Sequence, residues 1–374
     1  MAAVNNVLIV GGGVGGLCLA IVLKTQGIGV EVVDLDPHPS GSGIGIGPTG
    51  LRLLDRYGIA SQIVARGTSS NSIFYGDASG KPIADLAYVA KSGNGLPSNV
   101  TLSRAALADV LMKNATNAGI SILEGVTVDA IEQGETAAKV GLSDGTTRTV
   151  DLIVGADGAY SKVRELTFGK ELKPEFGGQG VWRWIVPNNI GLTEGMTLKG
   201  TTTKFGIFPL PGNEIYAYLM LNLKENIWVT PESTRNLMTE LLEEYTEPFA
   251  QAIRPTLIES TAYIYRPLET LFVTEPWYRG RCVLIGDAAH TMTPHLASGG
   301  VMAVEDAIVL AEELAAEGDL SEALARFMKR RYDRAKFIFD TSVQLSKLEQ
   351  LGNDSYPDYE SIRGNALKVL AEPV

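Results

Sequence analysis

The first candidate functional residues form a glycine-rich turn near the start of the chain. A short apolar run, residues 7–10, leads into Gly11, Gly13 and Gly16, and helical periodicity then begins at Val14. At the spacing G-x-G-x-x-G, such glycines allow a tight turn, a close backbone approach to a pyrophosphate and close packing of helix on strand. The start of the helix also directs unpaired N–H groups and a positive dipole end at the phosphates.

A carboxylate completes this unit. A second apolar run, residues 30–33, ends at Asp34, where a carboxylate can bind a ribose hydroxyl. The glycines alone would suit an ordinary structural turn, but the order strand, helix, strand and acid favours a nucleotide. The sequence therefore predicts that the chain begins with a dinucleotide-binding unit.

Two further motifs place an acid at the end of a predicted strand. One spans residues 151–164 and contains Asp157, and the other spans residues 281–307 and contains Asp287. With the first glycines, they resemble the three fingerprints of the flavin-dependent aromatic hydroxylases, the single-component FAD monooxygenases, with salicylate- and hydroxynicotinate-type hydroxylases as the nearest kinds. The resemblance runs over most of the chain and includes residues 43–48 and Arg104, which opens a predicted helix.

The resemblance implies FAD-binding roles for residues of the second and third motifs. Asp287 would accept the ribityl hydroxyls, and Asp157 would serve the pyrophosphate region and nicotinamide dinucleotide use. Gly299 and Gly300 would let the backbone approach the flavin ring, and the dipole of the following helix would stabilise negative charge on it. Arg104 is expected to support FAD. The structural alternatives are a helix cap for Asp287, an ordinary glycine pair in a loop, and a solvated surface charge for Arg104.

The resemblance also implies a reaction. NADH or NADPH would reduce FAD, and the reduced flavin would form a C4a-hydroperoxide with O2, whose distal oxygen passes to an electron-rich ring. The substrate would be a small aromatic compound, such as a phenol, a hydroxybenzoate or a hydroxypyridine. The protein would have to exclude water, hold the ring carbon near that oxygen and help to deprotonate the substrate.

Two residues are candidates for contact with that substrate. His295 follows Pro294 on the loop expected over the flavin, as in some salicylate- and hydroxynicotinate-type enzymes, and would act as a base near neutral pH or position a substrate hydroxyl or carboxylate. Tyr216, which alternates with Tyr218 on one strand face, would offer a hydroxyl to a phenol, although core packing is the simpler interpretation. Arg183 could pair with a substrate carboxylate or lie on the solvent face of its strand. His290 is expected to be structural.

The pattern of elements predicts an α/β fold, with a Rossmann-like FAD-binding domain, an inserted and mainly antiparallel β-sheet domain for the substrate, and C-terminal helices. Residues 1–72, 100–170 and 277–320 are assigned to the first domain, residues 73–99 and 171–276 to the second, and residues 321–374 to a helical segment. One helix, at residues 233–245, interrupts the inserted sheet, a loop is expected at residues 37–47, and the tail after Gly352 carries no clear pattern.

Composition excludes several other classes. A net charge of −11 argues against binding to nucleic acid or to an anionic membrane surface, and no apolar run is long enough to cross a bilayer. Two cysteines and three scattered histidines form neither a redox pair nor a metal site, so the cysteines are expected to be buried apolar residues. A cytoplasmic enzyme with an organic cofactor, monomeric or homodimeric, is the expectation.

Three other functions stay open at the level of sequence. Trp182-Arg-Trp184-Ile-Val-Pro187 is similar to the W-x-W-x-I-P motif of flavin-dependent halogenases, which are usually longer and carry it elsewhere. An epoxidase or an uncoupled oxidase would use the same fold. A flavin-binding redox sensor without catalysis is the third.

Overall fold

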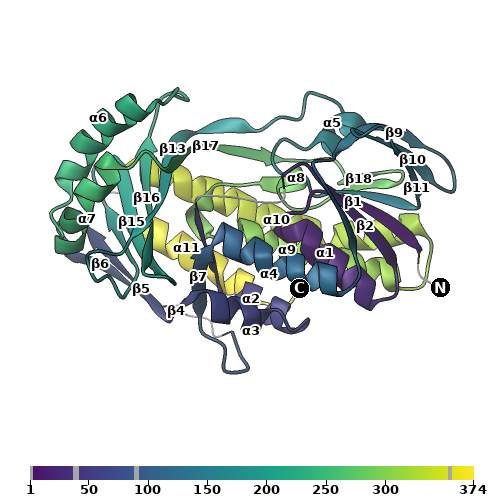
Figure 1. Cartoon of the computed structure of the whole chain (residues 1–374), viewed down its shortest axis with the longest axis horizontal. Coiled ribbons are helices and arrows are strands. Elements are labelled where there is room, and N and C mark those ends of the chain that lie inside the picture. Colours follow the sequence, from purple (N-terminus) through teal and green to yellow (C-terminus); the bar gives the residue numbers. More distant parts are fainter. Residues whose placement is uncertain (1–2, 37–41, 88–91, 353–355) are drawn as a thin grey trace.

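The computed structural model describes residues 3–36, 42–87, 92–352 and 356–374. Two halves lie side by side in Figure 1, each built around its own sheet, with the long strands β13 and β17 and the helix α10 passing between them. One sheet is mainly parallel and the other mainly antiparallel. The predicted α/β fold with an inserted antiparallel sheet is confirmed.

The first half is organised by a six-stranded sheet of order β18-β19-β12-β1-β2-β8, parallel except at β18. Its strands are β1 (Asn6–Val10), β2 (Gly29–Asp34), β8 (Ser121–Glu124), β12 (Leu152–Gly155), β18 (Tyr278–Arg279) and β19 (Cys282–Leu284). Because β1, β12 and β19 are parallel neighbours, the three sequence motifs that follow them meet at one edge of the sheet.

Helices and a small sheet enclose this parallel sheet. Helices α1 (Val14–Thr25), α4 (Arg104–Asn117) and α9 (Gly299–Ala315) pack together beside it (Figure 1). The small antiparallel sheet consists of β9 (Val128–Gln133), β10 (Ala138–Leu142) and β11 (Thr147–Val150), and α5 (Lys162–Phe168) contacts β9. Cys18 and Cys282 are both buried in this core, as predicted.

The second half is a seven-stranded sheet of order β17-β13-β16-β15-β14-β5-β6. Its strands are β5 (Ser72–Asp77), β6 (Pro82–Ala87), β13 (Glu175–Pro187), β14 (Met196–Lys199), β15 (Thr203–Leu210), β16 (Glu214–Asn222) and β17 (Tyr263–Phe272). One face packs on α6 (Pro231–Leu241), the short helix η1 (Leu242–Glu244) and α7 (Pro248–Glu259). We call the opposite face, which carries Arg183, Tyr216 and Tyr218 and looks toward the first half, the inner face.

A third, small sheet connects the halves. It has the order β3-β7-β4, from β3 (Gly43–Ile46), β7 (Asn99–Ser103) and β4 (Thr68–Ser70), and is followed or flanked by α2 (Pro48–Asp55) and α3 (Ala60–Arg66). The predicted loop at residues 37–47 is wrong for residues 43–46, because pairing with β7 turns a glycine-rich stretch into a strand. Residues 37–41 of that loop lie outside the described residues.

The C-terminal part is helical. Helix α10 (Leu320–Gln350) is followed by α11 (Tyr356–Ala371), which lies against α10 and α2. The sequence did not predict α11, nor α7, whose internal Pro255 masks its helical pattern. The two short helices near the predicted site are α8 (Asp287–His290) and η2 (Pro294–Leu296).

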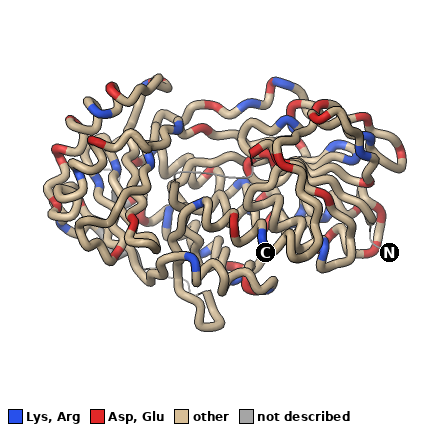
Figure 2. Tube along the Cα trace, in the orientation of Figure 1, with Lys and Arg blue, Asp and Glu red and all other residues tan. Residues whose placement is uncertain are grey.

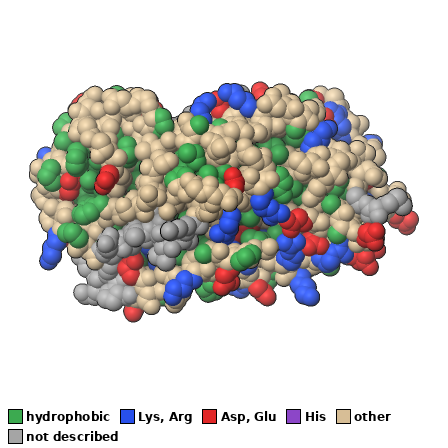
Figure 3. All heavy atoms as spheres, turned by 90° about the horizontal axis from the view of Figure 1, so that it is seen from below, with side chains coloured by type: hydrophobic (Ala, Val, Ile, Leu, Met, Phe, Trp, Pro, Cys, Tyr) green, Lys and Arg blue, Asp and Glu red, His purple; other side chains and the backbone are tan. Residues whose placement is uncertain are grey.

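Charge is spread over both halves. Acidic and basic residues alternate along the trace in Figure 2, and in the face shown in Figure 3 hydrophobic side chains lie scattered among polar ones. Across the part of the chain that the structure describes, no helix combines the length and the apolar character needed to cross a membrane.

Candidate active site

The turn after β1 is shaped for close approach of backbones. Gly11 has a φ of +109°, and a Cβ there would overlap the carbonyl group of Ala156, while a Cβ at Gly16 would overlap the carbonyl oxygen of Gly11. A Cβ at Gly13 would meet nothing within 4 Å, and no side chain of the described residues caps the start of α1 at this position. The open side of Gly13 and the free N–H groups from Val14 onward therefore suit a pyrophosphate.

Asp34 and Asp157, the two acids predicted near the nucleotide, lie on either side of this turn. The Asp34 carboxylate accepts hydrogen bonds from the backbone N–H of Gly12 and, at 2.7 Å, from that of Asp36. Asp157 holds the start of α5, because its carboxylate accepts the N–H groups of Lys162 at 2.7 Å and Val163 at 3.1 Å. Asp34 thus lies where a ribose is expected, whereas the contact of Asp157 with a nucleotide stays a prediction.

A buried arginine that sequence reasoning passed over connects the second and third motifs. Arg164 donates to the carbonyl oxygens of Ala159 at 2.6 Å, Leu172 at 3.1 Å and Ala288 at 2.9 Å. It therefore fixes the loop after β12 against the residue that follows Asp287. Its place at the end of the second motif was the only signal in the sequence.

Asp287 and Arg104 both reach water where the two halves meet. Both side chains are exposed to water, yet desolvation raises the pKa of Asp287 and lowers that of Arg104. From this combination we infer that they line a recess in the surface, which we call the cavity. The charge of Arg183 and the hydroxyl of Tyr216 also act on Arg104, so residues from both halves converge here.

The start of α9 borders the same cavity. Asp287 Oδ1 lies 4.0 Å from the position that a Cβ of Gly299 would take, and a Cβ of Gly300 would lie 3.6 Å from Ile44 of β3. Ser298, which precedes the helix, makes no capping hydrogen bond with its side chain. The glycine pair therefore leaves room for a flat group above a helix start with free N–H donors.

The inner face adds an aromatic wall, which we define as Phe208, Tyr216 and Tyr218. The rings of Phe208 and Tyr218 are stacked with centroids 6.2 Å apart, and the ring of Tyr216 lies 6.1 Å from that of Tyr218. Each ring packs directly on a glycine, so a Cβ at that glycine would overlap the ring. The pairs are Phe208 on Gly195, Tyr216 on Gly43 and Tyr218 on Gly206. All three are half-buried, so the wall presents ring surface to the cavity.

Arg183 lies on the inner face beside this wall. In the strand register it pairs with Tyr218 of β16 and with Ile264 of β17. It is half-buried, and no hydrogen bond or ion pair joins its guanidinium to any described residue. Of the two interpretations that the sequence left open, the structure places it toward the cavity side of the sheet.

His295 is linked to this wall through Glu349, whose charge acts on Tyr218. The ring of His295 has no exposed surface, and its Nε2 is 3.5 Å from Oε1 of Glu349, which also pairs with Lys204. Burial lowers the pKa of His295, and Lys204 adds to this effect. Burial would raise the pKa of Glu349, but Lys204 and His295 together outweigh it and the pKa is lowered. His295 therefore lies against a buried ion pair, and its contact with a substrate stays a prediction.

The two tryptophans of the halogenase-like motif face away from the cavity. Trp182 and Trp184 are fully buried in the core between the sheet and helices α6 and α7, where Trp182 Nε1 donates to Thr234 Oγ1 at 3.4 Å. They are packing residues here, which removes the structural support for the halogenase alternative.

Comparison with known proteins shows the family of the chain. Residues 5–342 match the FAD binding domain family. YetM, a putative FAD-dependent monooxygenase of Bacillus subtilis, is 30% identical over 98% of this chain and 99% of its own length. The aurachin C monooxygenase/isomerase of Stigmatella aurantiaca is 30% identical over 93% of this chain and 90% of its own length.

A solved structure shares the fold over nearly its whole length. Klebsiella pneumoniae HpxO, in its complex with FAD and uric acid, superposes with a TM-score of 0.85 over 98% of this chain and 97% of its own chain. The sequences are 20% identical, so this likeness concerns the fold.

Proposed function

The chain belongs to the FAD binding domain family of FAD-dependent monooxygenases, and we propose that it uses NADPH or NADH and O2 to hydroxylate a small anionic aromatic compound. Phenolates, hydroxybenzoates and hydroxypyridines are the substrate classes in view. Uric acid, bound by the structural relative HpxO, is likewise a flat polar ring.

The residues present fit FAD. The open side of Gly13 and the uncapped start of α1 suit the pyrophosphate, Asp34 suits the ribose, and Asp287 suits the ribityl hydroxyls. Gly299 and Gly300 leave space for the ring, and Arg104 supplies a nearby positive charge. When bound, FAD takes electrons from the nicotinamide and activates O2.

The observation that carries the proposal for the substrate is the aromatic wall with Arg183 beside it. Half-buried rings favour an aromatic ring through stacking, and a guanidinium without a partner among the described residues favours a carboxylate or phenolate oxygen. Both kinds of contact would hold a ring in one orientation against the start of α9.

Two residues would complete the reaction. Tyr216 would accept or donate a hydrogen bond at a substrate hydroxyl and so help to hold its proton. For His295 we propose a supporting role through Glu349, since its buried ring lies against that carboxylate.

Aerobic consumption of NADPH and NADH tests this function. The purified protein, reconstituted with FAD, is given hydroxylated benzoates, phenols and hydroxypyridines, and the products are weighed by mass spectrometry. We expect anionic rings to accelerate consumption and to gain one oxygen atom. Acceleration with hydrogen peroxide as the only product from every ring would refute hydroxylation of these classes.

A further inference from the structure

The carboxylate of Asp287 reaches the cavity through an unusual turn. Gly286, directly before it, has φ +59° and ψ −140°, and a Cβ there would lie 2.9 Å from the Cβ of Ala303 on α9. The one-turn helix α8 then begins at Asp287 and ends at His290. Because α8 is so short, its own hydrogen bonds define the direction of Asp287 poorly, and something outside it has to fix the turn.

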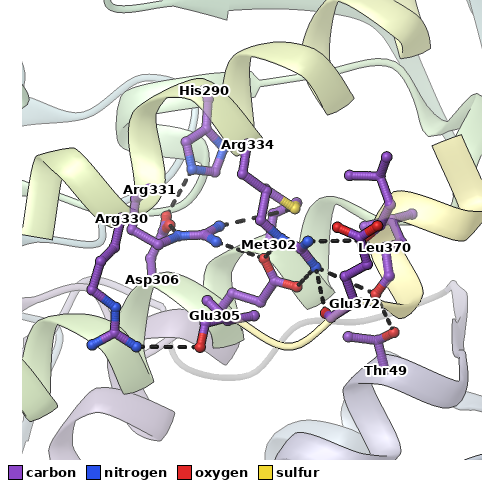
Figure 4. A network of polar contacts seen from close by, with 12 residues as sticks. Thr49, His290, Met302, Glu305, Asp306, Arg330, Arg331, Arg334, Leu370 and Glu372 are labelled. Atoms are coloured by element: carbon purple, nitrogen blue, oxygen red, sulfur yellow. Dashed lines mark hydrogen bonds and ion pairs between the residues drawn. The ribbon is translucent and has the colours of Figure 1, made fainter.

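One buried carboxylate holds both ends of α8. Asp306 lies on α9 one turn after Ala303, and its Oδ2 accepts the backbone N–H of Gly286 at 2.8 Å. The same oxygen lies 2.7 Å from Nε2 of His290, which donates to it whenever Nε2 carries a proton (Figure 4). A single atom thus ties the residue before Asp287 and the last residue of the helix to α9.

The carboxylate of Asp306 is itself fixed and charged. Its Oδ1 accepts from Nε of Arg331 at 2.7 Å, and both side chains are fully buried. Burial would raise the pKa of Asp306, but His290 and Arg331 outweigh it and lower the pKa to about 2. An ionised acceptor makes stronger hydrogen bonds than a neutral one, so the charged carboxylate holds α8 firmly.

A neighbouring carboxylate supplies a natural comparison. Glu305 is equally buried and also binds Arg331, with Oε2 at 2.7 Å from Nη1, but it contacts Arg334 where Asp306 contacts α8 (Figure 4). Loss of either carboxylate breaks the buried ion-pair cluster. Only loss of Asp306 releases Gly286 and His290.

We propose that Asp306 is a positioning residue for cofactor binding, which aims the carboxylate of Asp287 at the ribityl chain of FAD by fixing both ends of α8. This inference rests on the proposed place of FAD. The buried cluster of His290, Asp306 and Arg331 would then raise the affinity for the cofactor as well as stabilise the fold.

The matched variants Asp306→Ala and Glu305→Ala test the proposal. The dissociation constant of FAD is measured by flavin fluorescence with the apo forms, and urea unfolding reports their stability. We expect both variants to lose similar stability, while Asp306→Ala weakens FAD binding about tenfold or more and Glu305→Ala changes it less than about threefold. Equal dissociation constants for the two variants would overturn the proposal.

A second comparison shows whether Asp306 acts through Asp287. In an Asp287→Ala background we expect Asp306→Ala to weaken FAD binding no further than Glu305→Ala does, because there is no carboxylate left to aim. A full tenfold loss in that background would contradict the inference. Should the alanine variants fail to fold, Asp306→Asn and Glu305→Gln replace them with the same expected order.

Failure of the proposed function gives a different result. If the unaltered protein bound no FAD, the proposed FAD site itself would be wrong. If it bound FAD and only the variants behaved alike, the site would stand and the role of Asp306 would fall.

Discussion

At the scale of single residues, the charged groups fall into two kinds. Lys204 with Glu349, and Arg331 with Asp306, are buried and paired within the protein. Arg183 is half-buried on the inner face and makes no ion pair with any described residue. A half-buried charge without such a partner is available to a ligand of opposite sign. Pairing separates the charges that hold the fold from those available for binding.

Replacement of Arg183 by methionine should affect binding more than turnover. We expect KM for anionic ring substrates to rise about tenfold to hundredfold, because a charge-assisted contact is lost, with a smaller change in kcat. Steady-state kinetics with a benzoate and its neutral amide measure the effect. Arg266→Met, an exposed arginine on β17, is the control, and an equal rise in KM for the neutral amide would contradict a role in charge recognition.

His295 should make stability depend on pH. Its pKa is lowered by burial from the ordinary value of 6.5, so the unfolded chain binds a proton more readily than the folded one. Its contribution is therefore fully present above the unfolded pKa and is lost as the pH falls below it. We expect urea unfolding to show a steeper loss of stability between about pH 7.5 and pH 5.5 for the wild type than for His295→Gln. Parallel curves would contradict this.

At the scale of elements, the alternation of side chains along a strand predicted the strands best, whereas a glycine-rich sequence was the hardest to assign to an element. The inner and outer residues of β13, β15 and β16 follow their period of two, which the sequence displays. β3 was missed because its Gly-Ile-Gly-Ile pattern depends on pairing with β7, and α7 because of its internal Pro255. Helix α11 was missed although Tyr359, Ile362, Ala366 and Leu370, which meet the core, lie at helical spacing.

The glycine under each ring of the aromatic wall should not tolerate a larger side chain. A methyl group at Gly206 would clash with the ring of Tyr218, so Gly206→Ala should cost about 1–3 kcal/mol of unfolding free energy and impair substrate binding. Gly141→Ala in β10, where the added Cβ would be 3.6 Å from Ala130, is the control. Urea unfolding measures both, and similar small losses would refute the fit of ring on glycine.

Arg334 links the C-terminal helix α11 to Glu305 of α9. This side chain joins Glu305 at 2.7 Å (Figure 4). It also donates to the carbonyl oxygen of Val369 at 2.7 Å. Arg334→Met should lower the unfolding free energy by about 2–4 kcal/mol, since it leaves Glu305 with one partner fewer. Lys336→Met, which removes an exposed pair on the same helix, should stay within about 0.5 kcal/mol. Equal losses would contradict the role of Arg334.

At the scale of the whole molecule, the site exists only because two halves meet. Arg104, Arg183, Tyr216 and Asp287 come from α4, β13, β16 and α8, and their electrostatic contact crosses the interface. The sequence predicted the motifs and the nature of both sheets, because each depends on local spacing. It could not predict which inner-face side chain meets which motif, since that depends on how the sheets face each other. The cavity and the grip of Asp306 on α8 are therefore structural findings.

Turnover under isotopically labelled dioxygen tests the central claim, that this site inserts one oxygen atom from O2 into an aromatic ring. With the best substrate and a reduced nicotinamide, we expect the product to carry one labelled oxygen atom per molecule when labelled O2 is supplied, and none when only the water is labelled. A product whose new oxygen comes from water, or labelled hydrogen peroxide with an unchanged ring, would contradict the account.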